Sequence, residues 1–494
     1  MREVIPLVLR DSRWRLGGIV VLAAIVRVLF FTGFHGFDDV FYIQRSYELS
    51  QGIFSLPTTH WAARIGLVGP TAVAYRAFGV SLGTTVLFPF LCSLLTVVAT
   101  ALLGRRLFGE PVGWLAAFLV AVFPLDVIFA SMLFPTAPVT LLCGIGYGAF
   151  LLGDAEARQG WYLGSGAAFG LACVTHEAAL VALSFYVVHV ICQGRPRKGH
   201  LLALAGFFMA LAVDPVIHGF MGNPHVRLDV LSHTATAQGT ATDVAYSGFN
   251  VKWITEPVIR LAAERTFGLF SWLITLIALY RVLRPATLQD RALSLIVVTV
   301  FVWTEYGTMS LHRYAPLARL PRYLCPLTLP AMWLLAKYLC DAVRPKPRRI
   351  LLAVLVASSL ICLMVDSGNQ LRPYDAIRSA LTGIRPEAVA VEKNDEFPLR
   401  FAERMKPPYG LSVLGVTPPA QSIVIAKSPK LRRRLEAIPG ISEVGSVTRP
   451  RTLYQAMLTS PFVLSILRIV RPPERFAEYK DKASPDMWTI YRIP

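Results

Sequence analysis

Apolar segments recur along the first three quarters of the chain, separated by polar or basic residues. A helix that crosses a lipid bilayer takes ~20 apolar residues, and several of these segments are somewhat shorter. The eleven segments are Leu16–Phe34, Val80–Leu103, Pro111–Phe129, Met132–Leu152, Trp161–His176, Glu177–Cys192, Leu201–Val213, Phe267–Leu283, Leu293–Met309, Arg322–Cys340 and Ile350–Val365. The pattern predicts an α-helical polytopic membrane protein with about 11 transmembrane helices in residues 1–365. The basic N-terminus has no small-residue cleavage site, so we expect an uncleaved first span.

The pattern changes after residue 365. The stretches EAVAVEKN, QSIVIAKS and MWTIYRIP are short and rich in β-branched or aromatic residues, which favours strands. LRFAERM and KLRRRLEAI have helical spacing, and AMLTSPFVLSILRIV is more typical of a partly buried or interfacial helix than of a span. Residues 366–494 are therefore predicted to form a small C-terminal α/β domain on the extracytoplasmic (periplasmic) side.

Composition and charge agree with a membrane protein. The 494 residues are 54% hydrophobic and 16% charged, against about 25% charged in a soluble domain. The net charge of +18 would suggest a nucleic-acid partner in a soluble protein, but here the basic residues flank apolar segments. They are Arg2, Arg10, Arg13, Arg15, Arg105, Arg106, Arg195, Arg197, Lys198, Arg281, Arg284, Arg344, Lys346, Arg348 and Arg349. With about eleven spans all of them lie on one face, which the positive-inside rule makes cytoplasmic. We expect no nucleic-acid partner.

Two adjacent carboxylates follow the first apolar segment, in the predicted extracytoplasmic loop 35–79. Asp38 and Asp39 stand in GFDDVFYIQRSYELSQG, and acids this close to a bilayer are more often functional than decorative. A solvated turn is the alternative. The residues that follow can form a short amphipathic helix along the membrane surface, with both acids at its N-terminal end.

These residues resemble a known family. Asp38-Asp39, then Tyr42, Leu49 and Gly52, resemble the Asp-Glu…Tyr…Leu…Gly motif of the C-type glycosyltransferase superfamily, above all the bacterial relatives of protein O-mannosyltransferases and of the lipid A aminoarabinose transferase. The resemblance implies a multi-span enzyme whose sugar donor is linked to polyprenyl phosphate. It places the catalytic base at Asp38, while Asp39 replaces the usual Glu.

The same resemblance indicates residues that bind the donor phosphate. Arg64, in ARIGL, takes the place of the family's basic residue, and Pro321-Arg322-Tyr323 resembles its Arg-Tyr…Pro…Pro motif. Arg319 and Arg322 could add positive charge to that site. An arginine suits this role because its planar fork matches phosphate oxygens. For Arg64 alone, an interfacial arginine that extends to the lipid headgroups is the alternative.

Two further motifs depart from the family pattern. The family's second acid falls near Thr136, and Asp126 could substitute for it or be an ordinary acid at a helix end. GLACVTHE resembles Gly-Leu…Leu-Thr-Lys-Glu with His176 in place of Lys, and His176 and Glu177 could instead simply pair with each other. The candidate residues lining the active site are Tyr42, Asp126, His176, Glu177 and Tyr323.

The resemblance implies inverting transfer of a hexosyl or pentosyl group from a polyprenyl-phosphate-linked donor to a glycan, lipid or protein acceptor. It also implies a bacterial inner (plasma) membrane, with the active site facing the periplasm or exterior. The seven cysteines lie in apolar segments, and the sequence shows no CxxC pair or His/Cys cluster. A carboxylate pair beside a phosphate could hold Mg²⁺ or Mn²⁺, but with no secure third acid we favour a metal-independent reaction.

Three other functions stay open on the sequence. A transporter or flippase of lipid-linked sugars would also be polytopic and carry charged residues, although the chain has no inverted repeat. A ligase or polymerase of whole lipid-linked glycans would share the phosphate site. A non-catalytic membrane scaffold is the third, because a fold does not fix a function.

Overall fold

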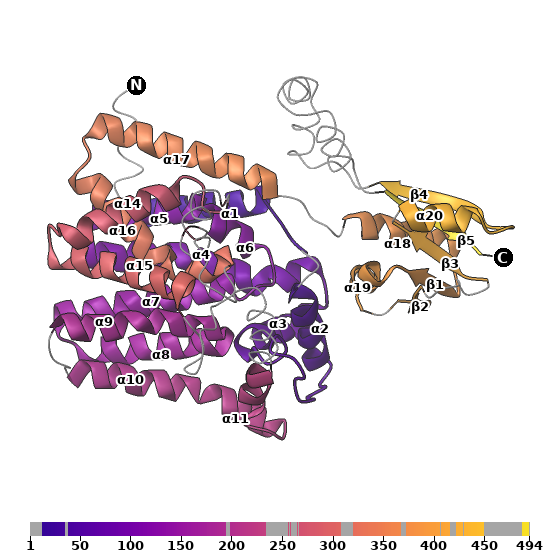
Figure 1. Ribbon diagram of the computed structural model, residues 1–494, viewed down its shortest axis with the longest axis horizontal. Coiled ribbons are helices and arrows are strands. Elements are labelled where there is room, and N and C mark those ends of the chain that lie inside the picture. Colours follow the sequence, from indigo (N-terminus) through magenta and orange to yellow (C-terminus); the bar gives the residue numbers. More distant parts are fainter. Residues whose placement is uncertain are drawn as a thin grey trace. The chain divides into compact units, whose positions relative to one another are not determined.

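The computed structural model describes residues 12–34, 38–193, 198–233, 266–307, 320–366, 372–405, 407–414, 421–427, 429–448 and 487–493, together with Thr255, Pro257 and Glu264. It divides into two compact units. The first is helical and comprises most of the chain up to Leu363. The second comprises Met364–Pro494 with two short segments, Thr32–Val40 and Val80–Leu82. Figure 1 gives the labels of the helices and strands.

The helical unit contains long helices, several of them broken by short turns. They are α1 (Ser12–Leu29), α2 (Asp38–Ser50), α3 (Ile65–Phe78), α4 (Leu82–Phe108), α5 (Glu110–Val122), α6 (Pro124–Ala130), α7 (Thr136–Glu156), α8 (Gln159–Thr175), the 3-10 helix η1 (Glu177–Leu183), α9 (Ser184–Gln193), α10 (Lys198–Leu211), α11 (Val213–Phe220), α14 (Phe270–Leu283), α15 (Leu288–Tyr306), the 3-10 helix η2 (Pro321–Leu327), α16 (Thr328–Asp341) and α17 (Pro345–Asp366).

Within the described residues, five helical stretches are long and apolar enough to cross a membrane. They are Leu82–Phe108, Thr136–Glu156, Lys198–Phe220, Pro321–Asp341 and Pro345–Met364. The bent pair α5 and α6 makes a sixth if it counts as one span. Helices overlap each of the eleven predicted segments, but several are short or charged, so the count of about eleven spans stays a prediction.

Prolines explain where two helices differ from the predicted segments. The segment Pro111–Phe129 is one predicted helix, but the chain turns by 57° between α5 and α6, because a residue before proline avoids helical backbone angles and Phe123 precedes Pro124. The segment Leu201–Val213 was expected to end at Asp214-Pro215. Instead α11 begins at Val213, because proline is tolerated in the first turn of a helix, where its missing N–H has no partner to lose.

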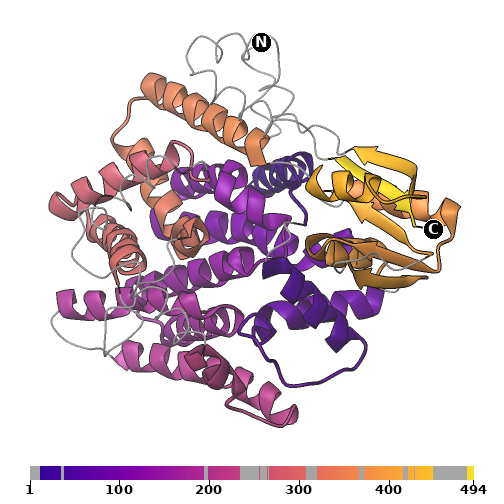
Figure 2. The same ribbon diagram turned by 45° about the vertical axis from the view of Figure 1, so that its right-hand side comes forward.

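Small residues let α8 and α10 pack closely. A Cβ at Gly166 would lie 1.7 Å from the carbonyl oxygen of Ala203, and one at Gly206 would lie 2.2 Å from that of Leu163. Small residues at helix contacts are typical of membrane proteins, where close backbone approach replaces the hydrophobic drive that lipid cannot supply. Figure 2 shows the helical unit from a second direction.

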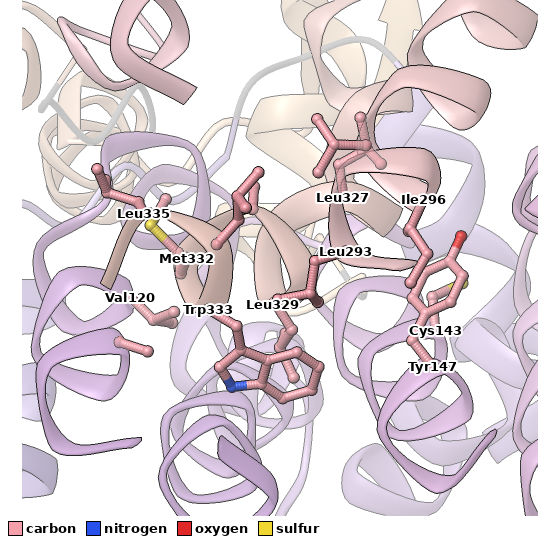
Figure 3. Packing of buried hydrophobic residues seen from close by; sticks show 14 of the residues in the cluster. Val120, Cys143, Tyr147, Leu293, Ile296, Leu327, Leu329, Met332, Trp333 and Leu335 are labelled. Carbon is pink, nitrogen blue, oxygen red and sulfur yellow. The ribbon is translucent and has the colours of Figure 1, made fainter. Parts of the chain in front are cut away.

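The core of the helical unit is apolar and contains large aromatic side chains. Trp333 of α16 is fully buried, and its indole N–H donates to the carbonyl oxygen of Thr100 in α4 at 3.0 Å. Leu329 and Met332 of the same helix lie beside it, and Tyr147 of α7 lies across the cluster (Figure 3). A buried tryptophan needs a partner for its one donor, and this bond fixes how α16 meets α4.

The second unit is built on a five-stranded sheet with strand order β2-β1-β3-β5-β4. β1 pairs in parallel with both β2 and β3, while β5 runs antiparallel to β3 and β4. Its elements are α18 (Arg372–Ile384), β1 (Ala388–Val391), α19 (Lys393–Ala402), β2 (Gly410–Val413), β3 (Ile423–Ala426), α20 (Pro429–Glu436), β4 (Ser442–Thr448) and β5 (Met487–Arg492).

The three strand-like stretches of the tail contain β1, β3 and β5, which are the buried central strands. β2 and β4 were not predicted, because they are exposed edge strands: β2 has only four residues, one of them glycine, and β4 is mostly polar. KLRRRLEAI overlaps α20, and LRFAERM overlaps only the end of α19. AMLTSPFVLSILRIV lies outside the described residues. The side of the membrane on which this unit lies stays a prediction.

Candidate active site

Helix α2 carries the two acids in its first turn, at Asp38 and Asp39. Negative side chains stabilise that end of a helix, because they face its unpaired backbone N–H groups. Asp38 is half-buried, Asp39 is buried, and Tyr42 is fully buried. Residues four apart lie on the same face of a helix, so Asp38 and Tyr42 share one face of α2.

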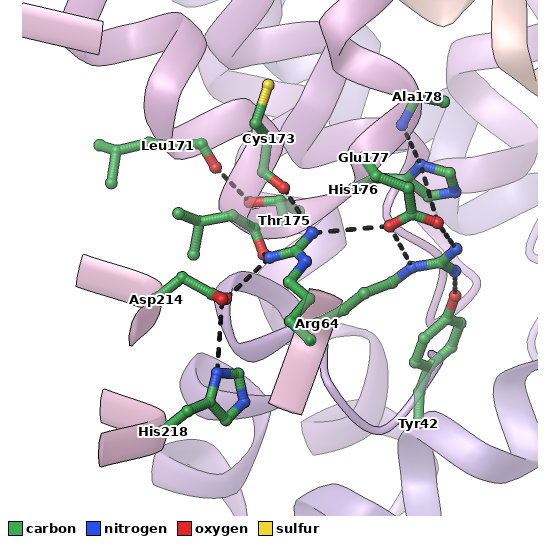
Figure 4. Close-up of polar contacts among 12 residues, drawn as sticks. Tyr42, Arg64, Leu171, Cys173, Thr175, His176, Glu177, Ala178, Asp214 and His218 are labelled. Carbon is green, nitrogen blue, oxygen red and sulfur yellow. Dashed lines mark hydrogen bonds and ion pairs between the residues drawn. The ribbon is translucent and has the colours of Figure 1, made fainter. Parts of the chain in front are cut away.

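Arg64 lies directly before α3, and its guanidinium is buried. It donates to both carboxylate oxygens of Glu177, with 3.1 Å from Nε to Oε2, and to the hydroxyl of Tyr42 (Figure 4). Burial alone would lower the pKa of Arg64, but Tyr42 and Glu177 raise it above its ordinary value. The side chain is therefore a fixed positive charge.

A close helix contact explains why Arg64 meets Glu177. Gly66 in the first turn of α3 faces Thr175, the last residue of α8, and a Cβ at Gly66 would lie 2.9 Å from the Cα and N of Thr175. Only glycine permits this approach. It brings Arg64, two positions before Gly66, next to Glu177, two positions after Thr175.

A second arginine completes this group. Arg227 donates to Asp214 Oδ1 at 2.8 Å and to the carbonyl oxygen of Val174 at 2.9 Å, and it lies 3.5 Å from Glu177 Oε2. His218 lies 3.4 Å from the other carboxylate oxygen of Asp214. Sequence reasoning did not select these three residues. The spacing of Asp214 and His218, four apart in an apolar helix, was the available signal.

Arg322, Tyr323 and His176 form the adjoining side of the site. The Arg322 guanidinium lies 4.9 Å from the ring centre of Phe134, and the His176 ring lies 5.4 Å from that of Tyr323. His176 Nδ1 accepts a hydrogen bond from the N–H of Ala178 at 3.0 Å. A cavity of about 10 Å³ lies among these residues, which is about the space of one water molecule.

The structure thus brings together Tyr42, Arg64, His176, Glu177, Arg322 and Tyr323, all predicted from the sequence. Their roles stay predictions. Thr136, at the place of the family's second acid, lines the same small cavity. Arg319 lies outside the described residues.

Asp126 lies in a different polar cluster. Its Oδ2 accepts from the hydroxyl of Ser93 at 2.6 Å and pairs with Arg27, which also donates to Ser93 and to two backbone carbonyls. Both charged side chains are buried, and the contacts join α1, α4 and α6. These contacts are typical of a structural ion pair within a helix bundle. Asp126 bonds to Arg27 and Ser93 rather than to the Arg64 cluster.

Arg64 and Arg227 surround the carboxylates of Glu177 and Asp214, and Arg322 lines the small cavity beside His176. Both carboxylates already have arginine partners, so this group suits an anion better than a metal ion.

Comparison with known proteins gives two kinds of match. A family model described as dolichyl-phosphate-mannose-protein mannosyltransferase matches residues 71–218. That range contains His176, Glu177 and Asp214, but it begins after Asp38 and Arg64. A search of curated proteins found no match.

Among solved structures, ArnT from Cupriavidus metallidurans bound to undecaprenyl phosphate is similar, with a TM-score of 0.58 and 13% identity over 88% of this chain and 97% of that one. Its apo state gives a TM-score of 0.55 and 14% identity over 96% and 98%. The oligosaccharyltransferase of Archaeoglobus fulgidus, tethered with an acceptor peptide containing the NVT sequon, gives 0.53 and 14% over 84% and 69%.

The resemblance to C-type membrane glycosyltransferases is therefore confirmed, because the family model and the shared fold agree with the motifs. At these identities the structural matches establish the fold.

Proposed function

We propose that this protein transfers a sugar from a polyprenyl-phosphate-linked donor to an acceptor on the non-cytoplasmic face of a membrane. The observation that carries the proposal is the cluster of Arg64, Arg227 and Arg322, which meets α2 where Arg64 contacts Tyr42. A leaving group that departs as a phosphate anion needs positive charge beside it. The fold supports the proposal, since one similar structure holds undecaprenyl phosphate.

The reaction has one bond formed and one broken at the sugar. An acceptor hydroxyl attacks the anomeric carbon while the bond from that carbon to the phosphate oxygen breaks, and the polyprenyl phosphate leaves with the electron pair. The acceptor proton passes to a carboxylate, which we assign to Asp38. Attack from the face opposite the leaving group inverts the anomeric configuration, as in enzymes whose carboxylate acts as base for an external nucleophile.

Helix geometry supports Asp38 as this base. Its Cβ lies about 5–6 Å from that of Tyr42 on the same face of α2, and the Tyr42 hydroxyl contacts Arg64. Tyr42 thus connects the acid-bearing helix to the phosphate-binding charge. Asp39 is buried, and its proposed role is to orient the first turn of α2.

The arginines divide the work of holding the phosphate. Arg322 is half-buried, lies over the rings of Phe134 and Tyr323, and lines the small cavity beside His176. We assign the direct phosphate contact to Arg322. Arg64 adds a fixed positive charge behind Arg322. Its Nη1 group, which donates to the Tyr42 hydroxyl, could also donate to the phosphate.

The acceptor is a glycan, a lipid or a protein, and the second unit is the part proposed to select it. The transferred group is a hexose or a pentose. The cluster gives no reason to invoke a metal ion in catalysis, since its two carboxylates are held by arginines.

The decisive experiment is the substitution Asp38→Asn, which keeps the size of the side chain but removes its ability to take a proton. We expect sugar transfer in membranes to fall by about 10²–10⁴-fold, the usual contribution of a general base. Binding of the polyprenyl-phosphate sugar should survive, because the arginines carry it. Asp39→Asn is the matched control and should cost less.

Two results would contradict this assignment. Transfer at the wild-type rate by Asp38→Asn would exclude Asp38 as the base and favour a flippase or a scaffold. Loss of donor binding together with transfer would show that Asp38 holds the sugar or a cation rather than a proton.

A further inference from the structure

A second group of polar side chains lies near the ends of helices α7 and α9 and the start of α10. Asp154, His189 and His200 each place one ligand atom within 4.8 Å of the other two. Three different helices supply them, at positions 35 and 11 residues apart, so no local motif in the sequence indicated the group. Figure 1 shows these helices beside α8 in the helical unit.

This group is separate from the candidate active site. His176 and Glu177 follow the C-terminal end of α8, whereas Tyr162, which contacts Asp154, lies in its first turn. α8 has 17 residues, so the two groups are roughly 20 Å apart at 1.5 Å per residue.

We propose that Asp154, His189 and His200 bind a divalent transition metal ion, and that zinc is the ion they fit best. Two imidazoles and one carboxylate are a zinc ligand set that leaves the fourth tetrahedral position to water. Imidazole nitrogen also disfavours Mg²⁺ and Ca²⁺, which take oxygen ligands.

The distances require only small movements. Two ligand atoms each about 2.0–2.1 Å from a zinc ion, at a tetrahedral angle, lie ~3.3 Å apart. His189 Nε2 lies 2.8 Å from Asp154 Oδ2, so this pair would open by about half an ångström as the ion replaces their hydrogen bond. The ligand atom of His200 lies at most 4.8 Å from the other two ligand atoms, so it would move toward them by at most ~1.5 Å.

The surroundings hold the ligands in place. The Tyr162 hydroxyl donates to Asp154 Oδ1 at 2.6 Å, so it orients the carboxylate while Oδ2 faces His189. Tyr162 occupies this position because glycines flank it: a Cβ at Gly153 would lie 3.0 Å from its ring, and one at Gly199 would lie 2.4 Å from it. Such contacts behind metal ligands commonly change metal affinity by about 10–100-fold.

Aromatic rings enclose the histidines. The ring of Phe150 stacks on His200 at 5.6 Å and meets His189 edge-on at 5.1 Å. This apolar wall covers one side of the group and limits how far the two imidazole rings can turn. A bound ion would join α7, α9 and α10 at one end of the bundle, so its proposed role is structural and independent of sugar transfer.

The test uses the full-length protein, purified in detergent without a histidine tag and stripped of metal by a chelator. Zinc alone is then titrated, with bound zinc measured after equilibrium dialysis and thermal unfolding measured on the same samples. We expect one strongly bound zinc ion per chain and a rise in Tm with zinc, since a ligand that binds only the folded state stabilises it. Magnesium should do neither.

Variants decide whether these residues are the ligands. His200→Ala and Asp154→Asn should each weaken zinc binding on the order of 100-fold or more, and Tyr162→Phe about 10–100-fold. Asp154→Asn retains the size of the side chain, so it separates metal loss from misfolding. The control is His225→Ala, at an exposed histidine, and Asp38→Asn should also bind zinc normally.

Either of two outcomes would overturn the proposal. If the wild type binds no more zinc than His200→Ala, the group is a hydrogen-bonded His-Asp pair. Alternatively, strong zinc binding could persist in both His200→Ala and Asp154→Asn, which would place the ion elsewhere.

Discussion

The substitution Gly66→Ala tests how the site is held together. A Cβ at this position would lie 2.9 Å from the Cα and N of Thr175 and 2.5 Å from its Oγ1. The backbone atoms cannot rotate away, and the hydroxyl is held by a 2.9 Å bond to the carbonyl oxygen of Leu171. An ordinary contact begins at 3.4 Å, so α3 and the end of α8 must separate by about half an ångström.

This separation acts directly on the arginine cluster. Arg64 lies two residues before Gly66 and Glu177 two residues after Thr175, so the 3.1 Å bond from Nε to Oε2 would lengthen to ~3.6 Å, beyond hydrogen-bond range. Overpacking costs about 1–3 kcal/mol of unfolding free energy. Sugar transfer should fall roughly tenfold, since a displacement of 1 Å can cost about a hundredfold.

The matched control is Gly69→Ala, one turn further along α3. Its Cβ would meet only the side chain of Ile65, at 3.8 Å, and alanine is the better helix former by up to ~1 kcal/mol. Both variants are compared by thermal unfolding in detergent and by transfer in membranes. If Gly66→Ala is as stable and as active as Gly69→Ala, the close approach of α3 and α8 does not position Arg64.

Three further predictions follow from other contacts. Arg322→Ala should weaken donor binding by about 1.5–3 kcal/mol, roughly tenfold or more, while Arg284→Ala, at an exposed arginine, should leave it unchanged; equal binding in both would remove the phosphate role. Arg27→Met should cost about 3–5 kcal/mol of unfolding free energy, because it leaves Asp126 buried without its partner; a stability equal to the wild type would show that the pair is dispensable. A reporter fused after Arg349 should be cytoplasmic and one at the C-terminus should be outside; the same side for both would contradict the span count.

The apolar pattern predicted where helices lie but not how they break. The predicted junction at His176-Glu177 agrees with the observed one, since α8 ends at Thr175 and η1 begins at Glu177. A polar pair within an apolar run marks that interruption, but the change from η1 to α9 within the second segment was not predicted. The bend at Phe123 and the continuation past Pro215 depend on the exact place of a proline relative to a helix start, which the apolar pattern does not contain.

The candidate site was predicted only in part, because motifs indicate single residues but not which other residues the fold brings to them. Arg64, His176, Glu177 and Arg322 stand in motifs, so the resemblance indicated them one by one. Arg227 belongs to no such motif, and only the fold brings it to Asp214. Likewise Asp154, His189 and His200 have no sequence spacing typical of a metal site, and three helices must pack before they meet.

The packing of the bundle also bears on the choice between an enzyme and a flippase. A carrier must open its polar site to each side of the membrane in turn. Here the Arg227 guanidinium is bound to the backbone carbonyls of Cys173 and Val174 at the end of α8, so the polar cluster is fixed to one end of a helix. Farther from this end, Tyr147 and Phe150 of α7 and Phe169 of α8 pack edge to face with other aromatic rings. A sugar headgroup crossing between α7, α8 and α9 would have to displace these rings, whereas transfer at the helix ends requires no such movement. The arrangement of charge and packing therefore favours chemistry at one face over transport.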